Sequence, residues 1–149
     1  MLGRTYPGQN CALARALELI GERWTMLIIR DARFRGAKRF GEFQKSLGVA
    51  TNILTKRLDH LVEQGLMSFD PPTGEYRLTE SGHDLLVVAI AATEWGERWA
   101  ALCPIDFVDR STGRMVTAAL IDKDSGKPVE NGLVEARPRD ADLDLGDAS

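Results

Sequence analysis

The sequence predicts a mainly α-helical fold with a small amount of β structure, and two observations support this prediction. Apolar residues recur at helical spacing from residue 11 to residue 63, with glycines where the first helices should end. Residues 66–78 then hold two adjacent prolines and a Thr-Gly pair, which fit a strand, a turn and a second strand. These elements indicate a winged helix-turn-helix domain, and a C-terminal β-hairpin-like extension follows it.

Composition indicates one domain with an ordinary core. The chain has 149 residues, of which 44% are hydrophobic and 28% are charged. No window approaches the roughly 18 consecutive apolar residues of a membrane span, and residues 1–10 lack the apolar core of a signal peptide. Cys11 and Cys103 lie far apart, which suits a reducing compartment better than a disulfide scaffold. We therefore expect a cytoplasmic protein with no membrane partner.

Two helices are predicted before residue 37, and each ends at a glycine, Gly21 and Gly36. Their apolar positions are Leu13, Leu17 and Ile20 in the first helix and Trp24, Leu27, Ile28 and Phe34 in the second. In the second helix these positions should form a buried stripe with arginines around it.

The next two helices have the lengths of a helix-turn-helix unit. A short third helix is expected to end at Gly48, and Thr51, the predicted N-cap, opens a fourth helix that ends near Gly65. The expected core positions are Phe40, Phe43 and Leu47 in the third helix, and Ile53, Leu54, Leu58, Leu61 and Val62 in the fourth.

The wing is predicted as strands at residues 66–70 and 75–78, joined by a turn at Thr73-Gly74. Thr79 should then cap one long helix that continues to Trp99. Its apolar stripe consists of Leu85, Leu86, Ala89, Ala92, Trp95 and Trp99. Such a stripe packs either on the domain's own core or on a second copy in a dimer, so residues 1–102 are expected to form one domain that includes the dimerisation surface.

Residues 103–139 are predicted to form the small β extension, and residues 140–149 a frayed tail. The patterns DRSTGRMV (residues 109–116) and DKDSGKPV (residues 122–129) repeat at a spacing of 13 residues. Each resembles a hairpin turn, with MVTAALI as the strand between the two turns. Neither cysteine nor histidine occurs beyond Cys103, so tetrahedral zinc ligation is not available there. We expect no metal site and no cofactor.

Charge is distributed unevenly along the chain, whose overall charge is −3. Between Arg23 and Arg57, nine basic residues stand against two acidic ones, a local net charge of +7. From Cys103 onward there are six basic and ten acidic residues, a net charge of −4. A basic segment beside an acidic tail is typical of proteins that bind a polyanion. The alternative is a solvated helical face that happens to be basic and binds no polyanion.

The exposed face of the fourth helix is the predicted DNA-reading surface. Asparagine can bond adenine, threonine methyl groups can meet thymine methyl groups, and lysine can bond guanine or a phosphate. The residues expected at base edges and the nearest phosphates are Thr51, Asn52, Thr55 and Lys56. The other residues expected to contribute to DNA binding are Lys38, Arg39, Lys45, Arg57 and, near the base of the wing, Arg77. In a dimer, two such helices would enter successive major grooves about 34 Å apart.

The run from CALARALELIGERW to LDHLVEQGLM, followed by YRLTESGHDLL and EWGERW, resembles the HxlR family of winged helix-turn-helix transcriptional regulators. The resemblance covers about Cys11 to Trp99. It implies a MarR-like fold and a cytoplasmic homodimer that binds a pseudo-palindromic operator in double-stranded DNA. It also implies a response to a thiol-reactive compound or another small-molecule effector. The family's wing is usually longer and carries several basic residues, whereas FDPPTGEYR has only Arg77.

Cys11 is the candidate redox sensor, although Ala12 follows it where the family commonly has proline. It precedes the first turn of a helix, where backbone N–H groups and the helix dipole would stabilise a thiolate, and Arg15 lies one turn further on. Modification there could change the spacing of the two recognition helices and release DNA. The alternatives are that Cys11 is a small buried apolar residue, or that a metabolite is the trigger.

Catalysis is not expected. His60 and His83 lie on predicted helices with no carboxylate or nucleophile placed by local spacing, and no phosphate loop or nucleophile elbow occurs. The stronger alternative to a DNA-binding regulator is a winged helix that serves as a protein-interaction module, which would not need a basic recognition face.

Overall fold

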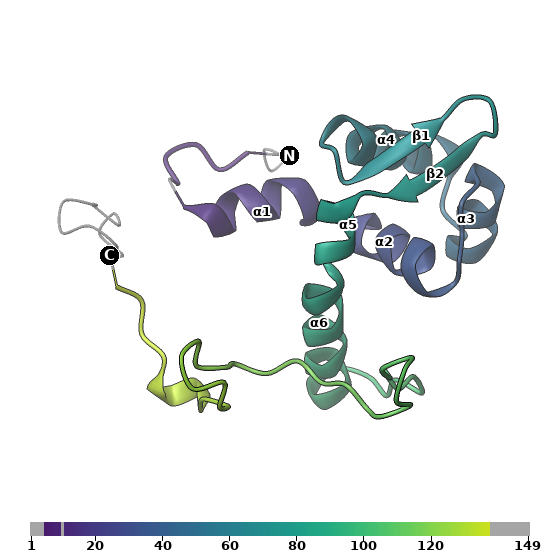
Figure 1. Cartoon of the computed structure of the whole chain (residues 1–149). Coiled ribbons are helices and arrows are strands. Elements are labelled where there is room, and N and C mark those ends of the chain that lie inside the picture. Colours follow the sequence, from purple (N-terminus) through teal and green to yellow (C-terminus); the bar gives the residue numbers. More distant parts are fainter. Residues whose placement is uncertain (1–4, 10, 138–149) are drawn as a thin grey trace. The chain divides into compact units, whose positions relative to one another are not determined.

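The computed structural model of the chain describes residues 5–9 and 11–137 (Figure 1). The chain divides into two compact units, residues 1–89 and residues 90–149. The predicted frayed tail, residues 140–149, lies outside the described residues, as do the last two residues of the predicted extension.

The first unit is mainly helical with one small sheet, as the sequence predicts. Its elements are α1 (Ala12–Ile20), α2 (Thr25–Phe34), α3 (Phe40–Leu47), α4 (Thr51–Glu63), β1 (Met67–Asp70), β2 (Glu75–Leu78) and α5 (Glu80–Asp84), and helix α6 (Leu86–Trp99) begins in this unit and ends in the second. The strands β1 and β2 pair in antiparallel register, with Met67 opposite Leu78 and Asp70 opposite Glu75. Helices α3 and α4 and this hairpin form a winged helix-turn-helix (Figure 1).

The core of this unit is formed where α2, α3, α4 and β1 meet. Its fully buried apolar side chains are Ile28, Ile29, Phe43, Leu54, Leu58, Leu61 and Met67. Three residues expected in the core, Leu27, Phe34 and Ile53, are exposed instead. The buried face of α2 centres on Ile28 and Ile29, and at 100° per residue Leu27 and Phe34 lie on the opposite side of the helix.

The turn between α3 and α4 is short because Gly48 adopts a left-handed conformation with φ +62°. Its N–H donates to the carbonyl oxygen of Gln44 at 2.9 Å, which ends α3. The N-cap of α4 is Ala50 and not Thr51, so that prediction is wrong by one residue. Ala50 keeps the extended backbone that an N-cap requires, and Thr51 is already the first helical residue.

The wing turn is closed by Gly74, whose N–H donates to the carbonyl oxygen of Asp70 at 2.8 Å. Residues 38 and 39 add a further bridge on the other edge of β2, because the N–H of Tyr76 donates to Lys38 at 2.7 Å and Arg39 pairs with Glu75. The wing is therefore tied to the segment that leads into α3.

The long helix predicted after Thr79 is in fact two helices, α5 and α6, which are separated at Leu85. Thr79 is the predicted N-cap and accepts a hydrogen bond from the N–H of Gly82 at 3.3 Å. The same hydroxyl donates to the carbonyl oxygen of Gly65 at 2.6 Å. A Cβ atom at Gly82 would lie 2.2 Å from the carbonyl oxygen of Leu66, so α5 packs against the chain that enters β1 without room for a side chain.

The second unit contains the two predicted turns, but MVTAALI is not a strand. Each turn has one isolated bridge, Val108 with Met115 and Ile121 with Pro128. Isolated hairpins are only marginally stable without a sheet or helix to pack on, and the side chains at these bridges are exposed. The extension is held to α6 by Glu94, whose carboxylate accepts the N–H of Ala118 at 3.1 Å.

The two turns repeat one another in hydrogen bonding. In each turn the aspartate carboxylate accepts from the hydroxyl and the N–H of a serine, Ser111 for Asp109 and Ser125 for Asp122, over 2.6–2.8 Å. These bonds hold the pKa of both carboxyl groups below the ordinary value of 3.8. The serine is the third residue of the first repeat and the fourth of the second, so these contacts do not come from equivalent positions. The repeated structure lies in the backbone, where the N–H groups of Gly113 and Gly126 donate to the carbonyl oxygens of Asp109 and Asp122 at 2.8 and 2.9 Å.

Within the described part of the chain, no helix is both long enough and apolar enough to cross a membrane.

Candidate nucleic-acid interface

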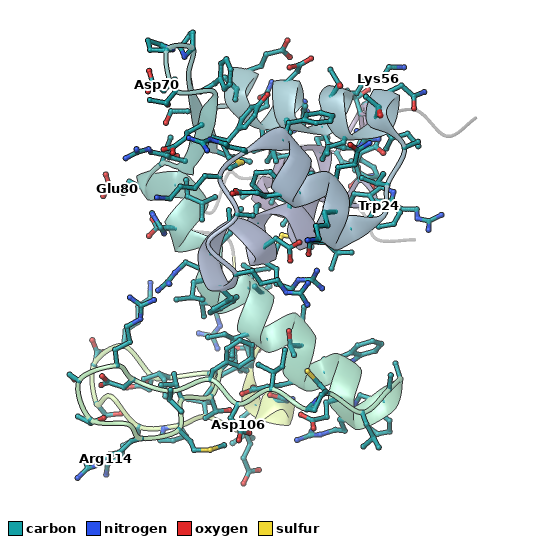
Figure 2. All side chains as sticks on the ribbon, turned by 90° about the vertical axis from the view of Figure 1, so that its right-hand side faces the viewer. Trp24, Lys56, Asp70, Glu80, Asp106 and Arg114 are labelled. Carbon is teal, nitrogen blue, oxygen red and sulfur yellow. The ribbon has the colours of Figure 1, made fainter. Side chains whose placement is uncertain are left out.

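The N-terminal half of α4 exposes one continuous polar face. Thr51 and Thr55 lie one turn apart on it, and so do Asn52 and Lys56, and all four side chains are exposed. Lys56 is labelled at the outer surface of the helix in Figure 2. Leu54, Leu58 and Leu61 on the opposite side are fully buried. The structure thus brings the four predicted DNA-reading residues together on one face of α4, while the opposite face packs in the core.

The two threonine hydroxyls are already engaged, whereas the amide and the ammonium group are available. Thr55 donates its hydroxyl to the carbonyl oxygen of Thr51 at 2.9 Å. Gln44 of α3 donates from Nε2 to Oγ1 of Thr51 at 2.8 Å. In the part of the chain that the structure describes, the side chains of Asn52 and Lys56 make no hydrogen bond or ion pair. Thr51 and Thr55 thus offer mainly methyl groups, while Asn52 and Lys56 offer polar groups.

Gln44 is a positioning residue that the sequence interpretation missed. Its amide links the two helices of the helix-turn-helix across the Gly48 turn, seven residues before Thr51. Gln44 borders the apolar stripe of α3, one turn after Phe40, but it is polar, so hydrophobic spacing alone does not mark it. Its position just before the turn glycine is the signal that could have revealed it.

Lys38, Arg39 and Lys45, the basic side chains expected at phosphates, are exposed on α3 and on the segment that precedes it. The start of α3 is organised by Glu42, whose Oε2 accepts from the backbone N–H groups of Lys38 at 2.7 Å and Arg39 at 2.9 Å. These two hydrogen bonds lower the pKa of Glu42 below its ordinary value of 4.5, with a smaller contribution from the nearby charges of the same two residues. Glu42 therefore remains ionised at neutral pH and fixes the backbone from which both basic side chains project.

Glu75 on β2 is shared by two of the predicted DNA-binding arginines. Its Oε2 lies 2.8 Å from Nη2 of Arg77, and its Oε1 lies 3.6 Å from Nη2 of Arg39. Both arginine side chains are largely exposed. Glu75 lies opposite Asp70 at the turn end of the hairpin and is shared by one arginine of the wing and one from the segment before α3. Asp70 itself lies at the wing turn (Figure 2).

Arg57 is the one predicted DNA-binding residue that the structure turns away from the exposed face. It lies beside the buried stripe of α4, and its Nη2 contacts Oε2 of Glu22 at 2.6 Å. From its place at the flank of the buried stripe, the sequence predicted that Arg57 extends to the DNA backbone, because its partner Glu22, 35 positions away, could not be predicted from local spacing.

Cys11 is the N-cap of α1 and is exposed, so in this chain it is not a buried apolar residue. Its Sγ accepts a hydrogen bond from the N–H of Ala14 at 3.4 Å. Arg15, expected to support it, instead contacts Glu18 at 2.6 Å and the carbonyl oxygens of Tyr6 and Gln9. The predicted placement at a helix N-terminus is confirmed, while the expected help from Arg15 is not observed.

A search of the described residues finds no group of three or more His, Cys, Asp or Glu side chains placed to hold a metal ion. The arrangement of the site offers hydrogen bonding and positive charge to a ligand.

Comparison with known proteins agrees with this geometry. The sequence profile of the HxlR-like helix-turn-helix family matches residues 19–103. The uncharacterised HTH-type transcriptional regulator Rv3095 of Mycobacterium tuberculosis is 44% identical over 103 residues, which cover 66% of this chain and 63% of that protein. The match thus spans less than two thirds of that relative. The regulator sll1512 of Synechocystis is 33% identical over 98 residues, 62% of this chain and 72% of that one.

Solved structures show the same relationship. PA1607, a candidate transcription factor, is 40% identical with a TM-score of 0.76, over 89% of this chain and 97% of its own. Quinone-bound YodB from Bacillus subtilis is 26% identical with a TM-score of 0.51, over 58% of this chain and 97% of its own. Because the family profile matches more than half of its residues, this chain belongs to the HxlR-like helix-turn-helix family.

Proposed function

We propose that the protein is a transcriptional regulator that binds a pseudo-palindromic operator in double-stranded DNA as a homodimer. One observation carries the proposal: Asn52 and Lys56 project with Thr51 and Thr55 from one exposed face of α4, inside the basic segment of the chain. A regulator that works on DNA in this way would act in the cytoplasm.

In this proposal α4 is the recognition helix and lies in the major groove. Asn52 bonds a base edge in a bidentate way, the methyl groups of Thr51 and Thr55 meet thymine, and Lys56 bonds guanine or a nearby phosphate. Lys38, Arg39 and Lys45 hold the phosphate backbone and set the register without reading sequence. Arg77, the basic residue of the wing, is the wing's proposed phosphate contact. Arg57 takes no part in contact with DNA.

The dimer is supported by exposed apolar residues on α1 and α6, each considered by itself. Leu13 and Leu17 lie one turn apart on α1, while Val88, Trp95 and Trp99 lie along α6, and all five side chains are exposed in the single chain. Exposed apolar stripes of this kind mark contact surfaces. We propose that residues 1–102 bind DNA and dimerise, and that residues 103–139 form an extension of separate role.

The proposed input is a small molecule or a thiol-reactive compound that acts at Cys11. The exposed thiol at the N-terminus of α1 supports this, as does the likeness to a relative solved with quinone bound. Modification of α1 would change the dimer and so the spacing of the two recognition helices.

The test is DNA binding measured against salt concentration with the whole protein. A dimer that contacts about six to ten phosphates should lose affinity with a log–log slope near −0.9 per contact. Replacing Lys45 with Ala should weaken binding to all sequences alike, whereas Asn52→Ala should reduce discrimination at one base position by about 1–3 kcal/mol. A flat salt response would refute DNA binding and favour a protein-interaction module. Repeating the titration with a quinone in wild type and Cys11→Ser tests the trigger: equal DNA release, or none in either protein, removes Cys11 as the sensor.

A further inference from the structure

One ion pair connects the recognition helix to the elbow between α1 and α2, which we define as residues 21–24. Nη2 of Arg57 lies 2.6 Å from Oε2 of Glu22, although the two residues are 35 positions apart in the chain. The side chain of Arg57 is 14% exposed and that of Glu22 is 35% exposed. A guanidinium withdrawn from water requires its counter-charge, because leaving it unpaired is costly. The pair thus holds two distant parts of the first unit together.

The elbow itself is constrained on both sides of Glu22. Trp24 has φ +78°, the one positive φ at a residue other than glycine among those the structure describes. A bulky side chain rarely adopts this conformation, which persists only where the surroundings enforce it. At Gly21 a Cβ atom would lie 2.5 Å from the carbonyl oxygen of Leu17, so a larger residue would force the backbone to move. Because few backbone conformations are available to the elbow, a contact with it restricts the position of α4.

Arg57 follows Lys56 directly and lies about one and a half turns after Asn52 on α4. Base recognition tolerates only about 10–20° of misorientation in the groups that read the bases. We infer that Glu22 and Arg57 are positioning residues whose ion pair sets the rotation of the recognition helix. Operator discrimination then depends on two residues that do not touch DNA. This inference rests on the proposed DNA-binding function. Since α1 ends at the elbow, the pair is also a route by which a change in α1 reaches α4.

A double-mutant cycle in the whole protein tests this role. The variants are Glu22→Gln, Arg57→Gln and the double variant, with Glu63→Gln as the control that removes a carboxylate elsewhere on α4. Each binds two duplexes, one selected by the wild type from a random library and one scrambled, across a range of salt concentrations. Either single substitution should reduce the preference for the selected duplex by about two- to thirtyfold. The double variant should be no worse than either single variant, because both remove the same contact. The salt slope on scrambled DNA should stay at the wild-type value.

Two results would overturn the inference. If Arg57→Gln lowers the salt slope by about one while Glu22→Gln is silent, Arg57 is a phosphate contact. If both variants lower the melting temperature but keep the wild-type preference, the pair is structural only.

A measurement without DNA separates failure of this inference from failure of the proposed function. Glu22→Gln should speed backbone hydrogen exchange in the first half of α4, while Glu63→Gln should not. Unchanged exchange there would refute the positioning role even if the wild type selects no duplex at all.

Discussion

Glu75 determines how much positive charge the wing presents. Its two carboxylate oxygens face Arg39 and Arg77, so the arginine before α3 and the arginine of β2 share one anion. Replacing Glu75 with Gln should raise affinity for any DNA sequence at low salt by about 1.5- to 5-fold, the effect of an exposed ion pair worth about 0.2–1 kcal/mol. The measurement is binding to scrambled DNA at several salt concentrations.

Asp70→Asn is the matched control for Glu75→Gln, because Asp70 lies on the same hairpin but its carboxylate accepts from Thr73 at 2.6 Å and faces neither arginine. It should change affinity less than Glu75→Gln does. Unchanged affinity in Glu75→Gln would mean that Arg39 and Arg77 do not approach the DNA backbone.

At the scale of the elements, the contact between α5 and the entry to β1 holds the wing against the helices. The Cβ atom of an alanine at position 82 would lie 2.2 Å from the carbonyl oxygen of Leu66, where backbone would have to move. Gly82→Ala should therefore lower the free energy of unfolding by about 1–3 kcal/mol. Denaturant unfolding of the whole protein measures it.

Gly41→Ala provides the comparison, because Gly41 lies within α3 with no atom within 4 Å of an added Cβ. That variant should be more stable than the wild type by about 0.5–1 kcal/mol, since alanine loses less backbone entropy in a helix. Equal stability of the two variants would show that the packing at Gly82 does not constrain the fold.

At the scale of the whole molecule, α6 should decide the oligomeric state. Trp99→Glu should convert the dimer to a monomer at micromolar concentration in sedimentation velocity, because it places a charge in an apolar interface. Operator affinity should then fall by about 10²-fold or more, since the two half-sites no longer act together. Met115→Glu is the control, because Met115 and Trp99 are both 70% exposed. A wild-type monomer, or a dimer that persists in Trp99→Glu, would contradict this assembly.

Local sequence patterns were enough to predict the order of most elements and the buried faces of α3 and α4. Helical spacing and terminal glycines are local properties, so α1, α3, the wing and the Gly48 turn lie where they were predicted. The polar face of α4 followed from the same rule: a stripe that includes Leu54, Leu58 and Leu61 leaves Asn52 and Lys56 on the opposite side. The repeat of the two aspartate turns was also visible, because each turn is closed by residues only two or three positions from its aspartate.

The contacts between side chains far apart in the chain could not be predicted from the sequence. Arg57 belongs to the basic segment, yet it forms an ion pair with Glu22 and is largely buried. Glu75 pairs with arginines from two different segments. Periodicity carries no information about such partners, because they depend on how elements pack. The break at Leu85 was hidden for a related reason: the predicted apolar stripe begins at Leu85 itself, and the five residues before it, ESGHD, carry no apolar spacing that could show where one helix ends. The predicted strand MVTAALI is absent for the same kind of reason. The segment has the composition of a strand but lacks a neighbouring strand that would complete a sheet.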